Sequence, residues 1–146
     1  MSLVTYTPLH EKFRSVAEDS RTFEAEGRPF DEADMLLTFA ALDVLGKADP
    51  TAMFLHFGNI DITGHAKGFH PDVPEYMRTI EITDRHVGKL LRALRSRPTY
   101  GNEDWLILVC TDHGGQGTDH AGGHDDPDVN TTFLIVSGPS ADSWLR

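Results

Sequence analysis

The spacing of apolar residues along the chain predicts two long helices. In the first, apolar residues recur at helical intervals over residues 31–46, with Asp31 as the expected N-cap. The second begins at Pro74 and carries the strongest helical periodicity in the chain, as far as Arg97. Residues 1–30, in contrast, form a polar segment with only weak periodicity.

Three short apolar runs predict strands. They read AMFLHF, WLILVCT and TFLIVS, at residues 52–57, 105–111 and 132–137. The run at 105–111 is almost wholly apolar, which is typical of a strand that is buried on both faces. The stretch that follows the first strand, residues 58–73, is too irregular in pattern for either a helix or a strand.

The order of strand, long helix and strand over residues 52–111 predicts a βαβ unit, and therefore an α/β fold. Such a unit pairs its two strands in parallel through a right-handed crossover. Ligands of parallel sheets bind beyond the carboxyl ends of the strands. We therefore expect the two polar loops that follow residues 52–57 and 105–111 to lie together on one rim of the sheet.

Both of these loops are rich in side chains that bind metal ions. Carboxylate oxygens and imidazole nitrogens are ligands of zinc and manganese. Glycines between them allow the backbone to turn tightly enough to aim several ligands at one point. The aspartate and histidine residues concerned are Asp61, His65, Asp112, His113, His120 and His124.

The order of these motifs resembles the alkaline phosphatase superfamily. A strand leads into an Asp-x-x-x-His loop, and a later strand leads into Thr111-Asp112-His113-Gly114-Gly115 with a further histidine downstream. The pattern is most similar to the type I phosphodiesterase/nucleotide pyrophosphatase-like members and to the metal-dependent phosphomutases. The resemblance covers about Ala52 to Pro139. It implies part of a three-layer α/β fold, with a mostly parallel sheet and flanking helices.

The resemblance also implies two divalent metal ions, with zinc as the first expectation and manganese as the alternative. Asp61 and His65 match the ligands of one ion, and a histidine downstream of the Asp-His-Gly motif completes that site. His120 stands in a Gly-Thr-Asp-His string similar to one in the phosphomutases, so it is preferred over the alternative, His124.

Asp112 and His113 match ligands of the other ion.

One element of the family pattern is missing from this sequence. Family members carry an earlier strand that supplies another aspartate and a Ser or Thr nucleophile. No apolar strand before Ala52 leads into such a loop. We therefore expect residues 1–30 to be a polar N-terminal segment and residues 31–146 to be the C-terminal part of a larger catalytic domain whose nucleophile is not in this chain.

The resemblance implies that this chain is part of a two-metal phosphodiesterase/nucleotide pyrophosphatase-like hydrolase, an enzyme that cleaves phosphate esters. We expect this part to be inactive on its own. The alternatives are a metal-dependent phosphomutase, a sulfatase relative, or a non-catalytic metal-binding module. The expected substrate is a small phosphate ester, and exposed sheet edges make a homo-oligomer an expectation as well.

Composition narrows the range of partners. The chain has 13 Lys plus Arg against 23 Asp plus Glu, a net charge of −10, which argues against binding to a nucleic-acid backbone. Its apolar runs are far shorter than the ~20 residues that a membrane span needs. Members of the superfamily are often periplasmic or secreted, but no signal segment opens this chain, so its location is not predicted.

Overall fold

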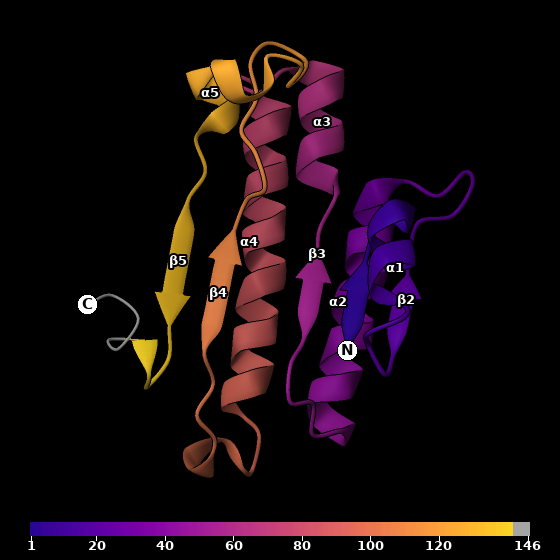
Figure 1. The fold of residues 1–146 in the computed structure, drawn as a ribbon, viewed down its shortest axis with the longest axis vertical. Coiled ribbons are helices and arrows are strands. Elements are labelled where there is room, and N and C mark those ends of the chain that lie inside the picture. Colours follow the sequence, from indigo (N-terminus) through magenta and orange to yellow (C-terminus); the bar gives the residue numbers. More distant parts are fainter. Residues whose placement is uncertain (142–146) are drawn as a thin grey trace.

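Two β-sheets and the helices that pack on them make up residues 1–141, the part of the chain that the computed structural model describes (Figure 1). In chain order the elements are β1 (Ser2–Val4), α1 (Thr7–Phe13), β2 (Ser20–Thr22), α2 (Phe30–Lys47), β3 (Phe54–His56), α3 (Asn59–Lys67), α4 (Pro74–Arg95), η1 (Tyr100–Asn102), β4 (Ile107–Cys110), η2 (Gly123–Asp125), α5 (Pro127–Asn130) and β5 (Leu134–Ser137). The expected α/β class and the long second helix are confirmed.

The first sheet is parallel and has the order β2-β1-β3. Its central strand, β1, lies within the segment that the sequence pattern describes only as polar and weakly periodic. Leu3 and Val4 are fully buried there, and Leu3 stands opposite Arg21 on β2 and Leu55 on β3. The pattern missed β1 because a strand of three residues is too short to display an alternation of apolar and polar positions.

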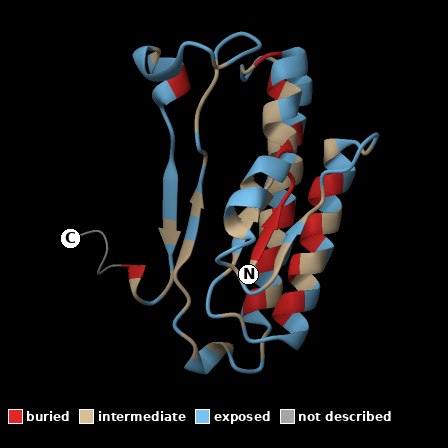
Figure 2. Ribbon diagram, turned by 45° about the vertical axis from the view of Figure 1, so that its right-hand side comes forward, coloured by how far each residue is buried: buried red, intermediate tan, exposed pale blue. Residues whose placement is uncertain are grey.

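The core lies between this sheet and helices α2 and α4. Leu37 and Ala41 of α2 are fully buried, and Leu90 and Leu94 of α4 pack against the same cluster as Leu3. Figure 2 shows the buried positions running along α2 and β1. Removing a buried leucine side chain of this kind costs roughly 2–5 kcal/mol, so this cluster sets the relative position of the two helices.

The start of α2 differs from the expectation. The helix begins at Phe30 with Pro29 as its N-cap, and no side chain caps it, so the prediction of Asp31 as the N-cap was wrong. Asp31 instead lies in the first turn, where an acidic side chain interacts favourably with the helix dipole. None of the helices within residues 1–141 combines the length and the apolar character that crossing a bilayer requires.

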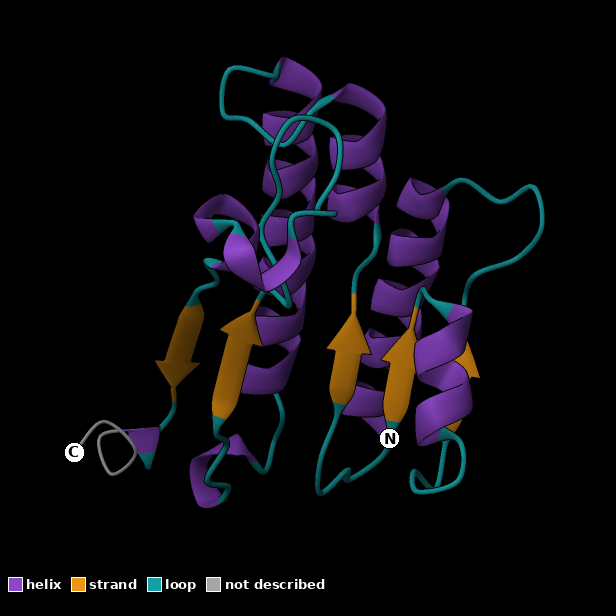
Figure 3. Cartoon of the chain, turned by 45° about the horizontal axis from the view of Figure 1, so that its top comes forward, coloured by secondary structure: helices purple, strands orange, loops and turns teal. Residues whose placement is uncertain are grey.

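The second sheet consists of β4 and β5, which pair antiparallel with Val109 opposite Ile135. The expected parallel ladder between β3 and β4 is absent from the described residues, since the two strands belong to different sheets. They nevertheless point in the same direction (Figures 1 and 3), so the loops that follow them leave from the same end of the molecule. That rim is where the sequence places its candidate chemistry.

Strand β4 is not buried on both faces, contrary to the expectation from its apolar run. Leu108 is 56% exposed and Cys110 is exposed, while Ile107 packs on the core. An apolar run shows that a strand can be covered on both faces, but within residues 1–141 only the face toward α4 is covered.

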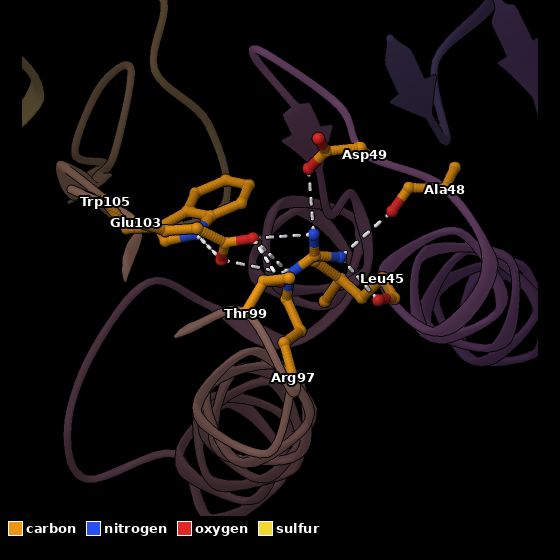
Figure 4. A network of polar contacts seen from close by, with 7 residues as sticks. All are labelled: Leu45, Ala48, Asp49, Arg97, Thr99, Glu103 and Trp105. Carbon is orange, nitrogen blue, oxygen red and sulfur yellow. Dashed lines mark hydrogen bonds and ion pairs between the residues drawn. The ribbon is translucent and has the colours of Figure 1, made fainter. Parts of the chain in front are cut away.

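At the opposite end of α4, Arg97 joins three segments of the chain (Figure 4). Its guanidinium donates hydrogen bonds to the backbone oxygens of Leu45 (2.7 Å) and Ala48 (2.9 Å), at the end of α2. It also pairs with the carboxylates of Asp49 and Glu103, each at 2.9 Å. Arg97 therefore caps the C-terminus of α2 and fixes the approach to β3.

Glu103 is held by more than one donor. Besides Arg97, the Thr99 hydroxyl and the Trp105 indole N–H donate to its carboxylate. These hydrogen bonds, that of Arg97 foremost, lower the pKa of Glu103 to about 2. The carboxylate thus stays charged over nearly the whole pH range. It connects the segment that precedes β4 to Arg97, just after the end of α4.

Candidate metal centre

The first candidate loop contains a helix that the sequence pattern did not predict. Helix α3 occupies Asn59–Lys67 within the stretch expected to be irregular. It places Asp61 and His65 four residues apart, and therefore on one face. The pattern missed α3 because the helix is short and has almost no apolar stripe.

Asp34 of α2 fixes where α3 begins. Its carboxylate accepts hydrogen bonds from the backbone N–H of Gly58 (3.0 Å) and of Asn59 (3.3 Å). Asp34 is 2% exposed, and this burial raises the pKa of its carboxyl to about 6 against the opposing effect of those hydrogen bonds. The carboxylate satisfies N–H groups at the start of α3 and so positions the turn that carries Asp61.

The second candidate loop follows β4 and returns over α3 (Figure 1). The backbone N–H of Gly114 donates to the oxygen of Val129 at 2.7 Å, which ties the start of the loop to α5. A Cβ at Gly114 would lie 2.0 Å from the backbone oxygen of Asp128, so only glycine allows this close approach. Farther along, Gly117 has φ +59°, a left-handed turn that directs the chain back toward His120.

The two loops bring three imidazoles around one carboxylate oxygen. The Oδ1 atom of Asp61 lies 3.5 Å from Nε2 of His65, 3.8 Å from Nε2 of His113 and 3.8 Å from Nε2 of His120. Nε2 of His65 and Nε2 of His120 are 3.1 Å apart. Asp61 Oδ1 is buried and has no hydrogen-bond partner among residues 1–141. An isolated buried carboxylate oxygen is costly, which indicates that something else balances its charge.

Hydrogen bonds at Nδ1 of His65 and His113 determine which tautomer each ring adopts, and therefore whether its Nε2 presents a lone pair to Asp61. Nδ1 of His65 lies 2.9 Å from the backbone oxygen of Thr118, and Nδ1 of His113 lies 2.7 Å from that of Gly114. A carbonyl oxygen only accepts, so both Nδ1 atoms carry a proton, and a neutral ring then presents a lone pair at Nε2. Lone pairs therefore face a carboxylate oxygen, an arrangement that a cation stabilises.

The spacing of the ligand atoms also fits a metal ion. Two ligands at roughly 2.1 Å from a tetrahedral zinc ion are about 3.4 Å apart. The ligand atoms of Asp61, His113 and His120 all lie within 4.8 Å of one another, and His65 contacts two of these residues. Hydrogen bonds from imidazole Nδ1 to backbone oxygens are also the usual outer partners of metal-binding histidines. The residues present fit a divalent metal ion.

The remaining candidate ligands lie farther out. The Asp112 carboxylate is 3.9 Å from Nε2 of His113, and its side chain is 77% exposed. His124 is exposed in η2, and within residues 1–141 no hydrogen bond or ion pair joins it to Asp61 or to the three imidazoles around it. Since His113 contacts both Asp61 and Asp112, the division of these ligands between two ions stays a prediction.

His56 and Asp34 are neighbours of the site that the sequence did not single out as functional. Nδ1 of His56 is buried and has no hydrogen-bond partner in the region that the structure describes, and burial lowers the pKa of this ring against the opposing charges of Asp112 and Asp61. A signal for Asp34 is present in the sequence: Asp34 and Thr38 are polar residues on the buried face of α2, between apolar positions.

Comparison with known proteins identifies the family. Residues 5–133 match the model of the type I phosphodiesterase/nucleotide pyrophosphatase family. The chain belongs to this family. The resemblance noted from the Asp-x-x-x-His and Asp-His-Gly motifs is confirmed, and so is the partial alkaline-phosphatase-like fold, with its parallel sheet flanked by helices.

Individual relatives of this phosphodiesterase-family chain are much longer proteins. GPI ethanolamine phosphate transferase 1 of Aspergillus fumigatus is 33% identical over 98 residues, which are 66% of this chain and 9% of that protein. The catalytic subunit of human GPI ethanolamine phosphate transferase 2 is 27% identical over 74% of this chain and 11% of its own length. The 2,3-bisphosphoglycerate-independent phosphoglycerate mutase of Haloarcula marismortui is 33% identical over 62% of this chain and 15% of its own length.

These relatives refine what the family match means. Their names describe transferases and a mutase, so chemistry on phosphate esters is what they share, and hydrolysis is not common to them. Members of the superfamily depend on metal ions, and the cluster of Asp61, His113 and His120 has the donor atoms of a possible metal site.

Proposed function

We propose that this chain supplies the metal-binding part of an active site that transfers or hydrolyses a phosphate ester. One observation carries the proposal: in the described part of the chain Asp61 Oδ1 is buried without a hydrogen bond, while three imidazole Nε2 atoms surround it within 3.8 Å. A divalent cation at this point would balance the carboxylate charge and accept the lone pairs of the surrounding imidazoles.

In this proposal Asp61, His65 and His120 hold one ion, with His113 beside them. A bound divalent ion supplies positive charge that stabilises the phosphoryl oxygens and lowers the pKa of an attacking hydroxyl or water. The backbone oxygens of Thr118 and Gly114 hold the rings in the tautomer that presents Nε2 to the site. Asp112, whose carboxylate lies 3.9 Å from Nε2 of His113, is proposed as a ligand to a second ion, shared through His113.

Zinc is the first expectation for the ion, and manganese is the alternative. A ligand set of two or three imidazole nitrogens with carboxylate oxygens suits zinc, and a larger share of carboxylate would favour manganese. The structure gathers more histidines than carboxylates around Asp61, which supports zinc.

For the reaction, transfer of a phosphate-bearing group is favoured over simple hydrolysis. Several relatives carry the name GPI ethanolamine phosphate transferase, which suggests a phosphoethanolamine ester as the substrate class. Hydrolysis of a phosphodiester is the second candidate, since the family model describes phosphodiesterases. Within residues 1–141 no serine or threonine hydroxyl is hydrogen-bonded to Asp61 or to the three imidazoles around it, so we propose that the nucleophile comes from another segment.

Metal binding by the chain tests the proposal directly. Titration calorimetry with Zn²⁺ and with Mn²⁺ is expected to show binding to the wild-type chain and strongly weakened binding to Asp61→Asn. Asp72→Asn, which alters an exposed carboxylate of the α3–α4 connection, is the matched control and is expected to bind as the wild type does. Absence of binding by the folded wild-type chain would overturn the proposal.

A second measurement addresses the missing nucleophile. The chain alone is expected not to hydrolyse a nitrophenyl phosphodiester in the presence of either metal. Turnover that is lost in Asp61→Asn would show that the chain is a complete hydrolase, and it would overturn the assignment of the nucleophile to another segment.

A further inference from the structure

Phe69 lies between the two loops that carry the metal ligands. It follows α3 in the chain, and its ring fills the space over two glycines, one from each loop. A Cβ at Gly64 of α3 would lie 2.2 Å from this ring, and a Cβ at Gly115 of the β4 loop would lie 2.5 Å from it. Both glycines therefore leave room for the same aromatic ring.

The ring of Phe69 also contacts two of the ligand imidazoles. Its centroid is 5.3 Å from that of His65 in an edge-to-face arrangement, and 6.4 Å from that of His120. Tyr76 of α4 supports it from a further direction, at 5.7 Å and again edge to face. Such aromatic pairs have preferred geometries and so restrict the orientation of each ring.

A backbone hydrogen bond holds Phe69 at this position. Its N–H donates to the oxygen of Gly117 at 2.7 Å, which connects the end of α3 to the β4 loop between His113 and His120. Gly68, with φ +119°, provides the turn that brings Phe69 back toward that loop. The ring is thus fixed both to α3 and to the segment that carries His120.

We propose that Phe69 is a positioning residue of the metal centre, setting the separation between the imidazoles of His65 and His120. This inference rests on the metal centre proposed above. The two histidines come from separate loops, yet their Nε2 atoms lie 3.1 Å apart, and the wedge between Gly64 and Gly115 is the packing contact that both loops share.

The physical basis is preorganisation of the ligands. With a smaller side chain at position 69, the glycine of the β4 loop can move toward α3, because no Cβ on either side stops it. His120 then moves relative to His65, and part of the free energy of metal binding is used to restore the ligand geometry. Metal affinity is expected to fall even where the chain stays folded.

Phe69→Ala and Phe69→Leu test the inference. Loss of an outer partner of a metal ligand typically costs 10–100-fold in affinity, so we expect a Zn²⁺ affinity about tenfold lower for Phe69→Ala and an intermediate value for Phe69→Leu. The visible spectrum of the Co²⁺-loaded chain is expected to change in band position or intensity, because it reports ligand geometry. Phe23→Ala is the control: Phe23 is likewise half-buried and packs on the core, so its loss lowers Tm and leaves affinity and spectrum unchanged.

A double-mutant comparison separates positioning from general packing. Gly115→Ala alone drives a Cβ into the Phe69 ring and is expected to weaken Zn²⁺ binding. In the Phe69→Ala background the same substitution is expected to cause little further loss, because the obstructing ring atoms are gone.

The outcomes distinguish this inference from the one on which it rests. If the wild-type chain binds no metal, the proposed metal centre fails. If the wild type binds and both folded Phe69 variants bind with the same affinity and the same Co²⁺ spectrum, the metal centre stands and the positioning role of Phe69 is wrong. Should Phe69→Ala not fold at the temperature of the assay, Phe69→Leu decides the question.

Discussion

His65 and His120 place their Nε2 atoms 3.1 Å apart across 55 positions of sequence. Nδ1 of His65 donates to the Thr118 oxygen, so in the neutral ring Nε2 carries a lone pair that accepts a hydrogen bond or binds a cation. The contact is therefore either a hydrogen bond from His120 or the gap between two ligands of one ion. The unpartnered Asp61 Oδ1 beside both rings favours the second interpretation.

The choice between the two downstream histidines gives a direct prediction. His120→Ala removes an atom 3.8 Å from Asp61 Oδ1, and Zn²⁺ affinity is expected to fall by about a hundredfold or more, beyond the typical effect of an outer partner. His124→Ala alters an exposed ring outside the cluster and is expected to leave affinity unchanged. Calorimetry on both variants checks this, and equal losses, or a larger loss for His124→Ala, would contradict the assignment.

Asp34 predicts a specific dependence of stability on pH. Its pKa is about 6 in the folded chain against an ordinary 3.8, so between these values the folded state binds more protons than the unfolded state. The stabilisation from this group is complete below about pH 3.8 and is lost as the pH rises through 6. The difference corresponds to on the order of 3 kcal/mol.

Asp34→Asn removes this titration. Urea unfolding between pH 4 and pH 7 is expected to show that the wild type loses stability relative to the variant as the pH rises. The comparison is made between the two proteins because His56 and His86, whose pKa values are lowered by burial, titrate in both and act in the opposite direction. Parallel stability curves for the two proteins would show that Asp34 does not titrate in this range.

The Arg97 network predicts an effect at lower pH. The pKa of Glu103 is lowered to about 2, so its stabilising contribution is present above about pH 4.5 and is lost as the pH falls toward 2. Thermal unfolding should therefore show a smaller loss of Tm below pH 4.5 for Glu103→Gln than for the wild type. At neutral pH, Arg97→Ala is expected to lower Tm by several degrees, because the end of α2 loses its cap.

A surface pair provides the control for this network. Lys47→Ala breaks an i,i+4 pair with Asp43 in which both side chains are largely exposed, and it is expected to change stability by less than about 1 kcal/mol. Neither Arg97→Ala nor Lys47→Ala should alter Zn²⁺ affinity in chains that remain folded. A Tm for Arg97→Ala that matches that of Lys47→Ala would mean that the network contributes nothing.

The uncovered face of the β4–β5 sheet predicts self-association of the isolated chain. Leu108 and Leu134 are 56% and 62% exposed, and the register places them on the same face. Light scattering is expected to show association that grows with concentration and that Leu108→Lys combined with Leu134→Lys reduces. Val16→Lys, at an exposed position outside the β4–β5 sheet, should have no effect on association. A wild-type chain that stays monomeric at all concentrations would refute this expectation.

How much of this could be read from the sequence depended on the length of each element. The periodicity of α4 spans 22 residues and identified it within two residues of its end, and the apolar runs located β3, β4 and β5. The strand β1 and the helix α3 escaped because each depends on tertiary contacts: β1 on its two neighbouring strands, and α3 on the carboxylate of Asp34.

For the site, the motifs identified the side chains but not their arrangement. Asp61 and His65 follow one predicted strand and His113 and His120 follow another, and the common rim of the two strands was enough to expect them together. That His113 faces Asp61 as well as Asp112 follows from the turn at Gly114, which no local pattern encodes. Phe69 gave no signal at all, because its role depends on a contact with Gly115, 46 positions away in sequence, as well as on the nearby Gly64.

Helix α2 is anchored at both ends to the segments that flank β3. Near its start Asp34 holds Gly58 and Asn59, just after the strand, and near its end Arg97 holds Ala48 and Asp49, just before it. The length of the helix thereby fixes the separation of these two contacts at about 21 Å. One residue inserted between them would rotate Asp34 by about 100° away from α3, so a change in α2, remote from any ligand, would displace Asp61.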